Sequence, residues 1–475
     1  MSRHSVATAC IALALALLLC SCSAAPPEPT FDLAITNVTL IDAKHGVRRQ
    51  QTIWVSGEQI AEIQASSGIR HQSTRTIDGT GRFLMPGLWD MHVHVTYEPA
   101  LTEPMANMFL DYGVTSVRDT GGLLPLLQPV VERWRRADTI APRIFYSGPL
   151  LDGSRVVYNG EGRSEIGIAN PNEAIARENI QTLVAAGVDF VKLYELVSPE
   201  VFASLVGAAR QRGLPIAAHV PLSMTADVAG PEVDSLEHLR NIELACSDRA
   251  LELHEARQQT LAQLEPASGY ALRSQLHAQQ RPLALGAVAL GSERCRRVIA
   301  SLGQTIQVPT LRLNTLFTYP MLQQPDWQAQ LARLPEPLAS EWQAAVSAAL
   351  ARNYPGNVAL AEWSMDLVAA MYRANVPIGA GTDTPIGLSI PGYSLHTELA
   401  RLVDAGLPPL EALRAANMRG PEFFGLSGKM GALEVGMAAD LVLLSADPLV
   451  DINNTRRIDA VIARGRIVRD SQPLN

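Results

Sequence analysis

An alternation of short apolar runs with longer amphipathic stretches, between about residues 86 and 425, most constrains the fold of this chain. Eight apolar runs have the length and β-branched content of strands: LWDMHVHV, VTSVRDTG, RIFYSGPLL, FVKLYEL, PIAAHV, SLEHL, TIQVPTL and VPIGAGTDTP. Helical patterns lie between most of them, and one, PEVFASLVGAARQRG, ends in the glycine typical of a helix C-terminus. These alternations predict an α/β protein with a TIM-type (β/α)8 barrel.

The two ends of the chain carry a different pattern. Residues 31–85 contain alternating runs such as FDLAITNVTLID, and residues 426–475 contain ADLVLLSADPLV and IDAVIARGRIV. Alternation of apolar and polar residues is typical of antiparallel strands with one buried face. The pattern therefore predicts one small β-sandwich domain that both ends of the chain build together.

The longest break in the alternation is a polar, mostly helical segment from about residue 241 to 304. We expect it to be an insertion in the barrel, either a lid or a contact in a homo-oligomer. The segment holds Cys246 and Cys295, the two cysteines outside the N-terminal region. An oxidising compartment would permit a disulfide between them, and two free buried thiols are the alternative.

The N-terminus is typical of an export signal, with a short basic start, an apolar stretch too short to span a membrane comfortably, and a small-residue exit. The residues LCSC that end at Cys22 resemble a bacterial lipobox, which implies a signal peptide over 1–22 and lipidation of Cys22. Residues 23–30 would be a linker. We expect an exported protein that is anchored through lipid in the periplasm or at the outer membrane, and a soluble periplasmic protein is the alternative.

The charge of the chain favours small molecules over nucleic acid as partners. The formal net charge is −8, and no basic stripe is present that would neutralise phosphates. An apolar content of 47% indicates a globular protein with a large core. We therefore expect a small-molecule substrate and no nucleic-acid partner.

Histidines and an aspartate lie where the predicted strands end. Side chains two residues apart on a strand point to the same side, so His92 and His94 both face the barrel interior near the carboxyl end of the first strand. Barrel enzymes keep their active sites at that end. His219, His238 and Asp383 end the fifth, sixth and eighth strands. Neutral imidazoles side by side are a natural start for a metal site, and partly buried structural histidines are the alternative.

The fourth strand directs a lysine into the same space. Lys192 in FVKLY points inward together with Tyr194. A lone buried lysine is costly, and it escapes by ion pairing or by loss of its proton. A neutral amine can add carbon dioxide to give a carbamate, and that carboxylate would bridge two cations.

At these residues the chain resembles the amidohydrolase superfamily, in the binuclear metal-dependent branch of imidazolonepropionase-like enzymes and Xaa-Pro dipeptidases. The motifs that carry the resemblance are PGLWDMHVH, VKLY, AAHV, EHL, GTDTP and the tail LEVGMAADLVLL. The loop after the third strand, SGPLLDGSRVVYNGEGRS, departs from the family pattern, so the substrate contacts of relatives do not transfer to it.

The resemblance implies a role for each matched residue. His92, His94 and Asp383 would hold one divalent metal and His219 and His238 the other, with a carbamylated Lys192 and a hydroxide between the metals. Zinc fits this nitrogen and oxygen ligand set best, and manganese, cobalt and iron are alternatives. The two cations would ionise water at neutral pH.

The same resemblance implies how protons would move at the site. Asp383 would take the proton from the attacking hydroxide and pass it to the leaving amine. Tyr194 would donate a hydrogen bond to the oxyanion, and the alternative is a tyrosine that fills the barrel.

Two further residues are weaker candidates for substrate contacts. Arg118, in SVRDTGG, has a planar fork suited to a substrate carboxylate, and an ion pair that stiffens the barrel is the alternative. His396, in SLHTELARLV, follows the eighth strand, and a helix-capping or surface histidine is the alternative. The remaining histidines of the β domain and of the insertion are expected at the surface; they are His45, His71, His254 and His277.

The sequence therefore predicts a metal-dependent hydrolase of carbon–nitrogen bonds. We expect it to cleave an amide in a dipeptide or an N-acyl amino acid. The alternative within catalysis is hydrolysis of a cyclic amide, lactone or organophosphate, because the same metal pair attacks carbonyl and phosphoryl centres. A non-catalytic, lipid-anchored binding protein is the alternative from another class, and the presence of all six ligands argues against it.

Overall fold

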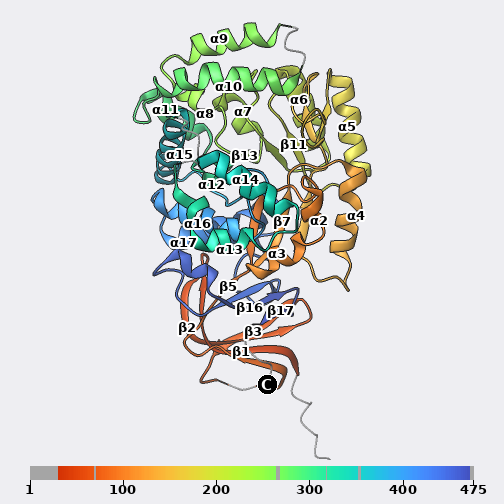
Figure 1. Ribbon diagram of the computed structural model, residues 1–475. Coiled ribbons are helices and arrows are strands. Elements are labelled where there is room, and N and C mark those ends of the chain that lie inside the picture. The colour runs from red at the N-terminus through yellow and green to blue at the C-terminus, as the bar shows by residue number, and fades with distance from the viewer. Residues whose placement is uncertain (1–29, 69–70, 264–267, 317, 351–354, 471–475) are drawn as a thin grey trace, which may run out of the picture.

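The computed structural model describes residues 30–68, 71–263, 268–316, 318–350 and 355–470. The predicted signal peptide, Cys22 and nearly all of the predicted linker lie outside these residues. Within them, no helix combines the length and the apolar character needed to cross a membrane. Figure 1 shows a part rich in strands, built from the red and blue ends of the chain, below a larger part in which helices surround strands.

Strands from both ends of the chain form one eight-stranded sheet. Its order is β17-β16-β15-β5-β1-β2-β3, and β4 pairs with β1. The strands are β1 (Phe31–Asp42), β2 (Gly46–Ser56), β3 (Gln59–Ala65), β4 (Ser73–Asp78), β5 (Phe83–Pro86), β15 (Leu441–Leu444), β16 (Ile458–Ala463) and β17 (Arg466–Asp470). Because β5 lies between β1 and β15, the C-terminal strands extend a sheet that the N-terminal strands begin.

The sheet is mixed, so the prediction of antiparallel strands is only partly right. β1 runs parallel to both β4 and β5, while the other neighbouring pairs are antiparallel. Alternating burial tells which face of a strand is covered, but it carries no information on the direction of the neighbour. Side chains from both ends share one apolar core, including Leu33, Ile35, Ile53, Leu441 and Ile462.

The middle of the chain contains two sheets whose strands are parallel. One has the order β6-β7-β8 and the other β10-β9-β11-β12-β13-β14. The strands are β6 (Leu88–Val93), β7 (Val114–Asp119), β8 (Arg143–Tyr146), β9 (Leu150–Asp152), β10 (Gly167–Ala169), β11 (Val191–Leu193), β12 (Ile216–Ala218), β13 (Ser235–Glu237) and β14 (Ile306–Val308). Most of their residues are buried, as expected when helices cover one face and packed side chains cover the other.

Residues 377–384, predicted as the eighth strand, carry isolated bridges instead of a regular strand. The segment bonds on both sides: the Gly379 N–H donates to the Gln307 carbonyl at 2.8 Å, and the Asp383 N–H donates to the His92 carbonyl at 2.8 Å. It lies close against β6, because a Cβ on Gly381 would be only 2.9 Å from the Cβ of His92. Glycine therefore permits the approach that brings Asp383 beside the end of β6.

Helices follow most of the parallel strands and bury their apolar faces against them. In α6, Ser198 caps the first turn by accepting a hydrogen bond from the Val201 N–H at 3.3 Å, and Pro199 occupies the first helical position. The helices before and after the insertion are α2 (Pro99–Thr102), α3 (Met105–Asp111), α4 (Leu124–Arg135), α5 (Glu173–Ala185), α6 (Pro199–Gln211), α7 (Ala226–Ala229), η1 (Gly230–Glu232), α12 (Leu311–Asn314), η2 (Pro320–Gln323), α13 (Pro325–Leu331), α14 (Leu338–Leu350), α15 (Pro355–Arg373), α16 (Tyr393–Asp404), α17 (Pro409–Asn417), α18 (Arg419–Phe423) and η3 (Ile452–Arg456).

The segment predicted as a helical insertion contains four helices and a disulfide. The helices are α8 (Ile242–Cys246), α9 (Ala250–Leu261), α10 (Gly269–Leu285) and α11 (Glu293–Ser301). Cys246 at the end of α8 is bonded to Cys295 in α11, so the disulfide alternative holds. Figure 1 shows α9 and α10 at the end of the molecule remote from β1.

Removing this disulfide is expected to destabilise the insertion. The bridge joins residues 49 positions apart, and cross-linking a loop of that length stabilises by about 4 kcal/mol in the chain-entropy model. We expect Cys246→Ser to lower the urea concentration at which half of the insertion is unfolded. Protease cleavage within α9 and α10, measured at increasing urea concentrations, reports this unfolding. The variant Cys246→Ser/Cys295→Ser should then be insensitive to reductant, and an unchanged midpoint in the single variant would contradict the prediction.

Candidate metal centre

A cavity of about 250 Å³ opens at the carboxyl ends of the parallel strands. The sequence-predicted ligands all line it: His92, His94, Lys192, His219, His238 and Asp383. They lie in or just after β6, β11, β12 and β13 and in the 377–384 segment. Residues as far apart in the chain as His92 and Asp383 are thus brought to one site because the strands that carry most of the ligands are parallel.

The first two histidines are oriented by hydrogen bonds on one ring nitrogen. His92 Nδ1 lies 2.7 Å from the Glu237 carboxylate, and His94 Nδ1 lies 2.9 Å from the Gly121 carbonyl. Both partners are acceptors, so the Nδ1 atom carries the proton in each neutral ring. The lone pair of each Nε2 is therefore free to bind a cation.

The other two histidines are held in the same way. His219 Nδ1 lies 2.8 Å from Glu195 Oε1, and His238 Nδ1 lies 2.7 Å from Thr310 Oγ1. The Thr310 hydroxyl donates its own proton to the Pro309 carbonyl at 2.8 Å, so it accepts from His238. In its neutral form each of the four rings thus carries its proton on Nδ1 and has its lone pair on Nε2, which is the form that ligates a metal.

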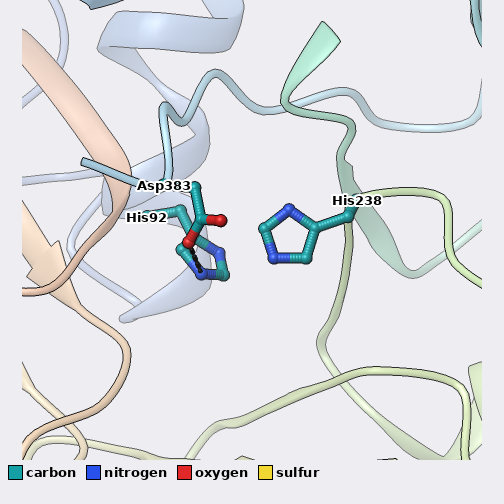
Figure 2. A group of neighbouring side chains, drawn as sticks. All are labelled: His92, His238 and Asp383. Carbon is teal, nitrogen blue, oxygen red and sulfur yellow. Dashed lines mark ion pairs between the residues drawn. The ribbon is translucent and has the colours of Figure 1, made fainter. Parts of the chain in front are cut away.

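Asp383 lies against the imidazole Nε2 atoms. Its Oδ1 atom is 3.2 Å from Nε2 of His92 and 3.2 Å from Nε2 of His94. Ligand atoms of His92, His238 and Asp383 all lie within 4.8 Å of one another. Figure 2 shows the carboxylate of Asp383 and the rings of His92 and His238 turned toward one space, with the ion pair between Asp383 and His92 dashed.

Lys192 is the unusual member of the cluster. Its Nζ atom is buried and has no hydrogen-bond partner among the described residues. Burial lowers the pKa of Lys192 to about 7, although Glu237 and Asp383 act in the opposite direction. A buried amine with a lowered pKa and no partner loses its proton more readily than an exposed lysine does.

The charges of the cluster also suit a cation. Burial lowers the pKa of both His219 and His238 well below the usual histidine value, so these rings are neutral. Burial acts to raise the pKa of Asp383, but the neighbouring histidines hold it well below its usual value. Neutral imidazoles, a carboxylate and a partnerless amine form a set of nitrogen and oxygen donors that fits divalent metal ions.

Two ligand residues have left-handed backbone conformations. His238 has φ of 62° and Asp383 has φ of 63°. Residues other than glycine seldom adopt positive φ, and those that do are concentrated at functional sites. At His238 the change of conformation directly follows Glu237, so adjacent side chains both reach the centre: Glu237 contacts His92, and His238 lines the cavity.

Arg118 lies outside the cavity, so the prediction that it contacts substrate is wrong. Its guanidinium is fully buried and donates to the Met91 carbonyl at 2.6 Å, to Ser235 Oγ at 2.9 Å and to Glu237 Oε1 at 2.7 Å. Its alternative, an internal ion pair, holds. Since Glu237 also binds His92, Arg118 positions a metal ligand through that carboxylate.

His396 is also removed from the cavity, so its predicted substrate contact is wrong. Its ring nitrogens lie 2.8 Å from Thr455 Oγ1 and 3.0 Å from the Tyr112 carbonyl. Burial lowers the pKa of His396 to about 3, which keeps the ring neutral. It joins α16 to η3 and to the end of α3.

His277 is expected at the surface, but it is partly buried and contacts Glu195 beside the site. Its Nε2 atom lies 2.7 Å from Glu195 Oε2, and Glu195 Oε1 supports His219. Arg273 also binds this carboxylate, with Nε 3.1 Å from Oε1. Helix α10 of the insertion thus reaches the metal centre through Glu195, a residue that follows Tyr194 but gave no separate signal in the sequence.

Glu195→Gln is expected to weaken metal binding by about 10- to 100-fold, as loss of a residue that orients a ligand commonly does. The amide replaces one of the two carboxylate oxygens. These oxygens lie against His219 Nδ1 and against Arg273 and His277 of α10. Metal affinity measured by competition with a chelator should show the change. Glu398→Gln is the matched control, because this buried carboxylate accepts only from the Leu311 and Arg312 N–H groups; equal affinity in both variants would contradict the prediction.

Fold and side chains together define an α/β protein with a candidate metal centre at the ends of its parallel strands. Residues 343–468 match the model of the amidohydrolase family. Adenine deaminase 2 of Rhizobium etli is 38% identical over 94 residues, which cover 20% of this chain and 16% of that protein. The chain therefore matches about one sixth of the length of this curated relative.

Solved structures of similar fold cover nearly the whole chain. A Xaa-Pro dipeptidase with bound methionine has a TM-score of 0.65 and 19% identity over 92% of this chain and 99% of its own. Bottromycin amidohydrolase has a TM-score of 0.67 and 22% identity over 94% of this chain and 88% of its own. These structures show that the fold is shared with amidohydrolases, and the family match over residues 343–468 agrees with the predicted resemblance to the amidohydrolase superfamily.

Proposed function

We propose that the protein is a metal-dependent amidohydrolase that cleaves an amide bond in a small peptide-like substrate, a dipeptide or an N-acyl amino acid. The observation that carries this proposal is the cluster of four imidazoles, each with its Nδ1 atom engaged, gathered with Asp383 and the partnerless amine of Lys192 around one cavity. The structural neighbours include a Xaa-Pro dipeptidase and bottromycin amidohydrolase, and the dipeptidase supports peptide-like substrates.

The proposal includes the architecture around the site. We infer that residues 377–384 close the parallel strands into a (β/α)8 barrel over about 86–425, because they bond to β14 on one side and to β6 on the other. We also infer that the eight-stranded sheet forms a small β-sandwich domain over 31–85 and 426–475. Export of the protein and its lipid anchor at Cys22 remain part of the proposal.

The residues would hold two divalent cations. His92, His94 and Asp383 would bind one, His219 and His238 the other, and a carbamylated Lys192 would lie between them. Zinc suits this ligand set best. When bound, such cations lower the pKa of water toward neutrality and polarise a carbonyl oxygen.

The protein groups then move protons and hold charge. Asp383 accepts a proton from the attacking water as its oxygen bonds to the amide carbon, and returns that proton to the amine nitrogen as the carbon–nitrogen bond breaks. Tyr194 lines the same cavity, and burial raises its pKa well above the usual value, so its phenol keeps the proton that it donates to the carbonyl oxygen. One water is consumed, and the products are a carboxylic acid and an amine.

Metal analysis and substrate assays test the proposed function. Protein purified in the presence of bicarbonate should contain close to two equivalents of a divalent metal, and it should hydrolyse members of a library of dipeptides and N-acyl amino acids. Protein dialysed against a chelator should lose both, and readdition of metal should restore activity. Metal-free protein that is fully active would overturn the proposal, as would turnover of lactones or phosphotriesters with no amide hydrolysed.

A further inference from the structure

We propose that the substrate is an N-acyl amino acid with a long apolar acyl chain, whose carboxylate binds Arg240 and whose chain enters a second cavity between α10 and α15. This inference rests on the proposed function and names its substrate class. It is carried by an arginine with free donors beside the metal ligands and by an apolar cavity that adjoins the site.

Arg240 lines the site cavity two residues after His238. Its guanidinium makes no hydrogen bond to any described residue, and its Nε atom is buried without a partner. The nearby carboxylate of Glu195 is 3.7 Å away, and that carboxylate is already bound by His219, His277 and Arg273. The single carboxylate of Glu195 faces the guanidiniums of both Arg240 and Arg273. Arg240 therefore presents a positive charge and unused hydrogen-bond donors to the cavity, and these could bind a substrate carboxylate.

A second cavity of about 720 Å³ lies between α10 and α15. The site cavity, at about 250 Å³, is smaller than the roughly 300–1,000 Å³ typical of ligand pockets, whereas the second falls within that range. Its apolar wall consists of Ala278, Pro282, Leu285, Val288, Leu290 and Trp363. The acidic residues that border it, Glu362 and Asp366, are exposed and would repel an anionic end. Charge and polarity therefore direct the carboxylate to Arg240 and the acyl chain to the second cavity.

The two cavities meet at Arg281 and Leu360, which line both. Arg281 is fixed in place, because its Nε atom lies 3.1 Å from Glu243 Oε1 and its Nη2 atom 2.8 Å from His277 Nδ1. The Leu360 side chain packs against the apolar core and makes up part of the wall of both cavities. In the proposal, an acyl chain passes beside Leu360, so the size of the side chain at 360 would control that passage.

A chain-length series tests this. With acyl groups from acetyl to decanoyl on one amino acid, kcat/KM of the metal-loaded protein should rise roughly two- to fourfold per methylene that enters the second cavity. Leu360→Trp should remove the rise, measured as the ratio of kcat/KM for the decanoyl substrate to kcat/KM for the acetyl substrate. Val358→Trp, the same type of change at a 45% exposed position of α15 that lines neither cavity, should preserve it. Equal kcat/KM for acetyl and decanoyl substrates would overturn the proposal.

The carboxylate contact has its own test. Arg240→Met should raise KM for an N-acyl amino acid about tenfold or more and leave KM for the corresponding carboxamide unchanged. An equal effect on both substrates would overturn the assignment of Arg240.

A binding measurement separates this inference from the proposed function. Calorimetry with the wild-type protein should show that decanoate binds and that acetate does not. This measurement requires neither turnover of a substrate nor the Leu360→Trp variant. If no N-acyl amino acid is hydrolysed but decanoate binds, the proposed function fails and the second cavity stands. If the substrates are hydrolysed without regard to chain length and decanoate does not bind, the proposed function stands and this inference fails.

Discussion

Replacing Asp383 with asparagine is expected to lower kcat on the order of a thousandfold, within the range that a general acid and base contributes. The amide keeps the shape of the carboxylate, but it cannot accept the proton of the attacking water or return it to the leaving amine. The Oδ1 contacts of 3.2 Å to His92 and His94 place the carboxylate among the proposed metal ligands, where the attacking water would be held in the proposed mechanism. Steady-state kinetics with a saturating amide substrate and a fixed metal content would measure the loss.

Asp440→Asn provides the control for that variant. Asp440 is also a buried aspartate, but it lies before β15, where it accepts from the Arg464 N–H at 2.7 Å and from Arg143 Nε at 2.8 Å. It should keep wild-type kcat. Thermal unfolding followed by circular dichroism should show that Asp383→Asn remains folded, and a folded Asp383→Asn variant with near wild-type kcat would remove Asp383 from the mechanism.

Lys192→Ala is expected to lower turnover by several orders of magnitude and to reduce metal content. The substitution removes the amine whose carbamate would lie between the cations, and it leaves space for a small acid. Formate or acetate added at high concentration should therefore restore part of the activity. Metal analysis and activity with and without the added acid measure both effects.

The same lysine gives the wild-type protein a predictable pH response. Only the neutral amine adds carbon dioxide, and the neutral fraction grows as pH rises through the pKa of about 7. With dissolved carbon dioxide held at the same concentration, reactivation of chelator-treated protein with metal should be roughly tenfold faster at pH 8 than at pH 6. A rate that is independent of bicarbonate, together with an active Lys192→Ala variant, would contradict the carbamate.

The site ligands could be predicted from the sequence because each lies at the carboxyl end of a short apolar run. In a parallel sheet these ends meet at one edge, so strand order alone brings His92, His219 and His238 together. The position of Asp383 could be predicted in the same way, although its segment is not a regular strand. The apolar, glycine-containing run before it resembles a strand, and the glycines permit the close approach to β6.

The partners of these ligands could not be predicted. Glu237 and His238 are adjacent, and strict alternation on a strand would send them to opposite faces. The positive φ of His238 ends the alternation. The residue types at and around position 238 do not predict this backbone conformation. His277 lies in a helix of the insertion, and only the tertiary fold shows that this helix faces Glu195.

The contact between α10 and Glu195 limits how the protein can be re-engineered. A designer who trims residues 241–304 to widen the entrance for bulky substrates would also delete Arg273 and His277, and would leave the buried carboxylate of Glu195 without two of its partners. We expect such a shortened protein to hold His219 less firmly and therefore to bind the proposed metal less tightly. Loop grafts between homologues should therefore exchange Glu195 and α10 as one unit.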